Sequence, residues 1–201
     1  LMVTIANFWV HLPKEQIQIL KTAENRFRPP KTGMTAKNRG RLRQFTDEQN
    51  VRRLVGLPSK VLATLDTTGP KVSDAVRVQE ALAVALLLVA PVRVKNLASI
   101  DIERHIHRVS KTSCSLVFPE MEVKNHQDLE YPLSSTVLQL LDLYLEVYRP
   151  LLAKKRGSKL FVSLNGNEKA PAFLSAQIPK FIKNELGLDM NLHLFRHFAG
   201  F

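Results

Sequence analysis

The chain has 201 residues, 45% hydrophobic and 23% charged, the balance of an ordinary soluble globular protein with one domain or one domain and part of another. Its net charge of +11 is unusual and favours a polyanionic partner, with nucleic acid ahead of a membrane surface. The single cysteine, Cys114, excludes an internal disulfide and a cysteine-rich zinc site, and the longest apolar run, which begins at Ala81, is too short to span a bilayer.

The N-terminal part of the chain is expected to lie outside the main domain. The first ten residues, with Trp9, have the apolar character of a helix whose partners lie upstream, although a frayed terminus explains them equally well. Residues 26–44, RFRPPKTGMTAKNRGRLRQ, contain a Pro-Pro pair, two glycines and many basic side chains. They have no apolar periodicity, which is typical of an irregular basic linker.

Residues 45–70 predict two short helices. FTDEQNVRRLV is expected to begin a helix with Thr46 as its N-cap, because two acidic residues follow in the first turn, where they favour the helix dipole. Pro58 is expected to interrupt the helix, and SKVLATLD to resume it.

The strongest helix is predicted in SDAVRVQEALAVALLLVAPVR. Its cap is expected at Ser73 or Asp74, and Pro91 is expected to end it. Since its second half is apolar on all sides, that half should be buried. A short helix is predicted from Arg93.

From Asp101 the pattern changes to short runs of β-branched and aromatic residues, which predict a small antiparallel sheet of two or three strands. SSTVLQLLDLYLEVYRPLLA then has helical periodicity, and SKLFVSLNGN predicts a short strand that enters an Asn-Gly turn. FLSAQIPKFIKNELG is expected to be a helix ending at Gly187, and NLHLFRHFAG to begin the last helix. The expected fold is therefore of the α+β class, mainly helical with a small antiparallel sheet.

Three motifs follow one another in an informative order. They are LLLVAPVRVKNLASIDIE, VKNHQDLEYPLSS and LHLFRHFAG. Each has an ordinary structural explanation when it is taken alone. Together they resemble the catalytic domain of the tyrosine-type site-specific DNA recombinases, the phage integrase family, from about Phe45 to the end of the chain. Arg93 opens the first box of that family, with Asn96 where glutamate is common, and 100 residues separate Arg93 from His193 in the second box.

The resemblance implies a role for each polar residue of these motifs. Arg93 and Arg196 would hold the two non-bridging oxygens of a DNA phosphate, since guanidinium groups donate paired hydrogen bonds and stay charged. Lys124 would be the general acid for the leaving 5′-oxygen, and His193 the general base or proton shuttle. His197 would buttress the site through a hydrogen bond. No metal or other cofactor is implied, because the arginines supply the positive charge.

Other basic residues offer alternatives. Lys111 competes with Lys124 for the role of general acid, but the distance of Lys124 from the following Tyr-Pro-Leu strand fits the family hairpin better. His105, His107 and His126 invite a metal site, yet no third ligand has a usable spacing from the first pair.

The family nucleophile is a tyrosine that forms a 3′-phosphotyrosine intermediate, several tens of residues after the second box. The tyrosines of this chain, Tyr131, Tyr144 and Tyr148, all precede that box and are interpreted as structural. We therefore expect a fragment, a truncated product or a protein that receives its tyrosine from a neighbour. Such a chain binds DNA and does not cleave it alone.

Two functions follow from the resemblance. The first is a recombinase domain for integration, excision or resolution, and the alternative is an integrase-derived DNA-binding protein without catalysis. Double-stranded DNA is the expected partner, contacted also by Arg39, Arg41, Arg43 and His197. The family acts as a tetramer on paired sites, whereas this chain is expected to be a monomer. A bacterial or phage-derived cytoplasmic protein without a membrane partner is the default, since no signal peptide pattern opens the chain.

Overall fold

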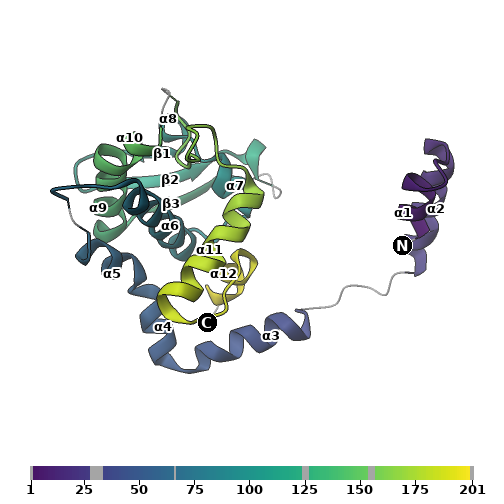
Figure 1. Cartoon of the computed structure of the whole chain (residues 1–201), viewed down its shortest axis with the longest axis horizontal. Helices are drawn as coiled ribbons and strands as arrows, with labels where there is room; N and C mark the ends of the chain where they lie inside the picture. The colour runs from purple at the N-terminus through teal and green to yellow at the C-terminus, as the bar shows by residue number, and fades with distance from the viewer. Residues whose placement is uncertain (1, 28–33, 66, 124–126, 154–156, 200–201) are drawn as a thin grey trace. The chain divides into compact units, whose positions relative to one another are not determined.

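The structure is a computed structural model that describes residues 2–27, 34–65, 67–123, 127–153 and 157–199 (Figure 1). The chain forms two compact units, Leu1–Thr35 and Ala36–Phe201. In the first unit, α1 (Met2–Phe8) packs against α2 (Lys14–Phe27). The assignment of residues 1–25 to a separate core-binding domain stays a prediction.

The prediction of an irregular linker over residues 26–44 is wrong for residues 26–27 and 36–43, which are helical, whereas residues 34–35 belong to no helix or strand. Residues 26–27 end α2, and α3 (Ala36–Arg43) is a helix of the second unit. The Pro-Pro pair lies outside the described residues. Helix α3 shows no apolar periodicity because Leu42 is its only buried residue. Tertiary contacts hold its end instead, since the Gln44 amide donates to the Asp189 carbonyl oxygen at 2.7 Å and accepts from the Asp189 N–H at 3.0 Å.

The turn η1 (Gln44–Thr46) leads into α4 (Glu48–Val55), whose N-cap is Asp47 and not Thr46 as predicted. An Asp47 carboxylate oxygen accepts from the backbone N–H of Gln49 at 2.9 Å. Thr46 cannot cap the helix because it belongs to the preceding turn, where its hydroxyl donates to the Arg43 carbonyl at 2.8 Å.

The next helix, α5 (Leu57–Ala63), begins one residue before Pro58, which occupies the first turn, where proline is tolerated. The central helix of the second unit is α6 (Val72–Val89), with Lys71 as its N-cap. The predicted caps at Ser73 and Asp74 are wrong because both residues lie inside the helix. Asp74 instead accepts from the Lys71 N–H at 3.1 Å.

Helix α6 carries the core, and the predicted burial of its second half is confirmed. Residues 81–87 are at most 2% exposed. This helix packs against α5, α9 (Ser135–Leu143), the π-helix η3 (Tyr144–Tyr148), α10 (Arg149–Leu152) and α11 (Pro171–Leu186).

The predicted antiparallel sheet is confirmed, with three strands in the order β1-β2-β3. They are β1 (Ile106–Arg108), β2 (Cys114–Phe118) and β3 (Leu129–Pro132). On the middle strand Cys114, Leu116 and Phe118 are buried in alternation, so one face of β2 is covered and the thiol of Cys114 lies inside. Helix α8 (Ile102–His105) precedes the sheet, and the turn η2 (Glu120–Glu122) follows β2.

The strand predicted in SKLFVSLNGN is wrong, since that segment forms only the isolated bridges Asp101↔Lys159 and Val162↔Glu168. The Asn-Gly turn is present, with Gly166 at a φ of 81°. The predicted end of α11 at Gly187 is confirmed, because Gly187 adopts the left-handed conformation at φ 74°. Figure 1 shows α11 beside the last helix, α12 (Leu192–Phe198). Among the described residues no helix is long and apolar enough to cross a membrane.

Candidate functional site

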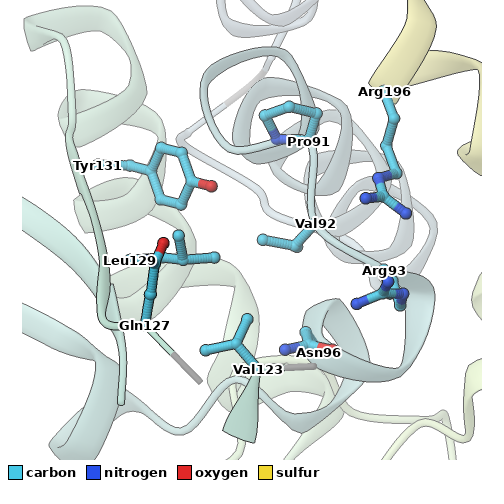
Figure 2. Close-up of a pocket in the computed structure, with 9 residues that line it drawn as sticks. All are labelled: Pro91, Val92, Arg93, Asn96, Val123, Gln127, Leu129, Tyr131 and Arg196. Atoms are coloured by element: carbon cyan, nitrogen blue, oxygen red, sulfur yellow. The ribbon is translucent and has the colours of Figure 1, made fainter. Parts of the chain in front are cut away.

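Arg93 and Arg196 line one cavity of about 300 Å³. Figure 2 shows both guanidinium groups on the same side of this cavity, which we call the first cavity. Arg93 is the N-cap of α7 (Val94–Ser99), and Arg196 comes from α12. The other lining residues are Pro91, Val92, Asn96, Val123, Gln127, Leu129 and Tyr131.

A second cavity, of about 560 Å³, shares Val92, Arg93 and Arg196 with the first. The remaining residues that line it are Val94, Lys95, Ser175, Asn191, Leu192 and His193. The structure therefore brings together three of the four predicted catalytic residues, Arg93, His193 and Arg196, around a common wall. The fourth, Lys124, lies outside the described residues.

The local sequence explains how Arg93 reaches the site. The apolar helix α6 ends where the N–H of Ala90 donates to the Leu86 carbonyl at 2.7 Å, and Pro91 has no N–H with which to extend the ladder. Arg93 is extended, at φ −70° and ψ 150°, and its carbonyl starts α7 by accepting from the Leu97 N–H at 2.9 Å. Because Leu97 is fully buried and anchors α7, the exposed Arg93 side chain is left at the helix start.

Helix α12 presents the other two residues. Its buried residues Leu194 and Phe195 anchor it in the core, while His193 and Arg196, three positions apart, are exposed on one face. The His197 ring packs edge-on against the His193 ring, with centroids 5.1 Å apart. The predicted buttressing hydrogen bond of His197 is not formed with any described residue, and ring packing takes its place.

The charge at this wall is uncompensated within the described part of the chain. The side chains of Arg93, Lys95 and Arg196 form no hydrogen bond or ion pair with any described residue, and no described carboxylate lines either cavity. Arg77, by contrast, lies 2.7 Å from a Glu185 carboxylate oxygen. Unpaired guanidinium groups in an acid-free cavity suit an anion, and their fork geometry matches the paired oxygens of phosphate or carboxylate.

The histidines considered for a metal site have other partners. His105 belongs to α8 rather than to a strand, and both of its ring nitrogens are engaged, since Nδ1 accepts from the Asp101 N–H at 2.8 Å and Nε2 lies 2.8 Å from a Glu122 carboxylate oxygen. His107 Nε2 lies 3.0 Å from the Arg104 carbonyl oxygen. His126 lies outside the described residues. Nowhere in the described chain do three potential ligands gather.

The predicted DNA contacts Arg39, Arg41 and Arg43 lie on α3, with Arg39 and Arg43 exposed. Helix α3 packs against α12, where the Asn191 amide donates to the Asn38 side-chain oxygen at 3.4 Å. These basic residues are therefore carried on a helix next to the one that bears Arg196.

Sequence reasoning missed several residues of the two cavities. Tyr131 was expected to be structural, yet it lines the first cavity, whereas Tyr144 and Tyr148 are fully buried as expected. Lys95 and Ser175 line the second cavity. Lys95 follows Arg93 by two residues, and this nearness along the chain is a signal that sequence reasoning did not use.

Comparison with known proteins supports the fold. No protein-family model matches the sequence, and no curated protein sequence matches it. Two structures of the XerH site-specific recombinase resemble this one, a post-cleavage complex with a palindromic difH substrate and a pre-cleavage complex with difH. Both have a TM-score of 0.53 at 16% identity, covering 75% and 76% of this chain and 38% and 40% of the XerH chains. The XerA recombinase gives a TM-score of 0.52 at 15% identity over 98% of this chain and 64% of its own.

This chain thus spans about two fifths of the length of the XerH chains that it matches. The expected α+β fold, mainly helical with a small antiparallel sheet, is confirmed by the observed elements, and it is the fold of the XerH and XerA structures.

Proposed function

We propose that this chain binds double-stranded DNA and that Arg93 and Arg196 hold one backbone phosphate, within the catalytic domain of a tyrosine-type site-specific recombinase. The observation that supports the proposal is that two arginines without a described partner meet at the wall of two cavities without a described carboxylate. The net charge of +11 favours a polyanion over a small carboxylate ligand.

The chemistry of phosphodiester transfer suits this arrangement. The reacting phosphorus becomes pentacoordinate and its non-bridging oxygens gain negative charge, which Arg93 and Arg196 would stabilise. Loss of one such donor typically costs roughly 2.7–4 kcal/mol of activation free energy. His193, exposed beside Arg196, would act as general base or proton shuttle. The role of Lys124 as general acid is proposed from the resemblance alone, as is a 3′-phosphotyrosine intermediate, and no nucleophile is assigned.

The proposed DNA surface extends to α3. Arg39, Arg41 and Arg43 would contact further backbone phosphates and so add affinity without sequence information. In the proposed layout, residues 1–25 end a helical core-binding domain, 26–44 form a basic connection that includes α3, and 45–201 form the catalytic domain. We further propose a monomer in solution and, for the whole recombinase, a tetramer on paired sites.

A paired substitution tests the phosphate clamp. The variant R93A/R196A is compared with R52A/R108A, which removes the same charge from two exposed arginines that pair with Glu48 and Asp142. Duplex affinity is measured by fluorescence anisotropy over a range of salt concentrations. We expect the clamp variant to reduce the magnitude of the slope of log affinity against log salt by about 1, since the two arginines hold one phosphate and each lost phosphate contact lowers it by about 1.

The control tests whether the clamp itself carries the binding. If the clamp variant and the control change affinity and salt slope equally, binding resides in the basic surface at large, as in a DNA-binding protein without catalysis. If neither variant changes the salt slope, the proposed clamp is wrong.

A further inference from the structure

Tyr131 lines the first cavity, and its hydroxyl is free of bonds to the described part of the chain. Figure 2 shows its ring on the cavity wall opposite Arg196, with the hydroxyl directed into the space between them. No described residue forms a hydrogen bond with that hydroxyl, and the side chain is only half-buried. A tyrosine that served packing alone would bury its ring and pair its hydroxyl, as Tyr144 does by donating to the Leu160 carbonyl at 2.9 Å.

The backbone around Tyr131 is held firmly. On β3 it lies opposite Leu116, a fully buried residue of the middle strand. Two residues later the N–H of Leu133 donates to the Cys114 carbonyl at 2.8 Å. Leu129 and Tyr131, two positions apart, project from the same face of β3, and both line the first cavity. The sheet therefore fixes where the phenol stands.

The two cavities place different proton-bearing groups on either side of the arginines. Tyr131 lines only the first cavity and His193 only the second, while Arg93 and Arg196 line both. An anion held by the two guanidinium groups thus has the imidazole on one flank and the phenol on the other. A phenol hydroxyl is an uncharged donor that adds a hydrogen bond without a counterion.

We propose that Tyr131 is a phosphate-contacting residue whose hydroxyl donates a hydrogen bond to the phosphodiester held by Arg93 and Arg196. This inference rests on the proposed function, because it requires the clamp to bind a phosphate. Tyr131 would then be a third hydrogen-bond donor in the first cavity, carried by the sheet rather than by a helix. The site would favour an anion large enough to contact both the arginines and the phenol.

The variant Tyr131→Phe tests this contact with little risk to folding, since the hydroxyl has no described partner to lose. Its unfolding temperature should equal that of the unchanged protein. The probe is dimethyl phosphate, the smallest phosphodiester, titrated while the ring signals of Tyr131 and the Nε–H signals of the arginines are followed by NMR. We expect the Phe variant to bind it about three- to tenfold more weakly, the range for one hydrogen bond to a bound ligand.

The outcomes separate this inference from the proposed function. Equal affinity of the Phe variant and the unchanged protein, with R93A/R196A losing binding, overturns the role of Tyr131 and leaves the clamp standing. Unchanged binding by R93A/R196A overturns the clamp and, with it, this inference. A shift of the Tyr131 ring signals on titration that disappears in R93A/R196A supports the contact.

Discussion

Glu80 and Glu185 lie on the facing helices α6 and α11, yet their surroundings act on them in opposite directions. Burial raises the pKa of Glu80 from 4.5 to about 7, against the opposing charges of Lys169 and Lys180. Hydrogen bonds from Arg77 and then Lys60 hold the pKa of Glu185 below its ordinary value in spite of some burial. The surroundings on α6 thus favour the neutral form of the glutamate side chain, and those on α11 favour its anion.

The Glu80→Gln variant is predicted to change how stability depends on pH. Because the folded pKa of Glu80 is raised, its contribution to stability is present below pH 4.5 and is lost as pH rises through about 7. The free energy of unfolding of the Gln variant should not show this decrease, which is roughly 1–2 kcal/mol after allowing for the partial exposure of the side chain. Urea unfolding from pH 4 to 8 measures it. Glu185→Gln is the matched control: because the pKa of Glu185 is lowered, its contribution to stability is complete above pH 4.5 and is lost only as pH falls below it, so this variant's loss of stability should not change between pH 5 and 8.

At the scale of single elements, the sequence predicted best where one local rule decides the outcome. The uninterrupted apolar run predicted the burial of α6 correctly, and the glycine after an amphipathic helix predicted the end of α11 correctly. Helix α3 was missed because Leu42 and the Gln44–Asp189 bonds hold it through tertiary contacts, which leave no periodicity. The cap of α4 was misplaced by one residue because Thr46 and Asp47 are both good caps, and only the preceding turn decides between them.

The junction between α11 and α12 offers a prediction at this scale. Gly187 sits at φ 74°, and a Cβ there would meet no atom within 4 Å, so the Gly187→Ala variant should lose stability only through backbone strain. We expect about 1–2 kcal/mol of destabilisation, measured by thermal unfolding. Gly157→Ala is the control, since its Cβ is also unobstructed and its φ is not in the left-handed region. Equal losses in the two variants would contradict the assignment of strain to Gly187.

For the molecule as a whole, the site depends on segments that no local pattern joins. The order of Arg93, Lys124, His193 and Arg196 suggested a common site only through the resemblance to a family, because residues 100 apart carry no shared periodicity. Tyr131 was interpreted as a structural strand residue, because the sequence shows that it lies on a strand but not where its hydroxyl points. Cavities arise from the packing of α7, α12 and β3 together, so their full lining could not be read from any one element.

The two units differ sharply in the core that each can supply, and this gives the last prediction. Apart from Ala6 and Ile17, every buried hydrophobic residue of the described chain lies beyond Ala36. Since burial of apolar surface is the main stabilising contribution, the fragment 36–201 should fold alone and unfold cooperatively within a few degrees of the full chain. Differential scanning calorimetry checks this. A broad, non-cooperative transition of the fragment would show that residues 1–35 complete its core.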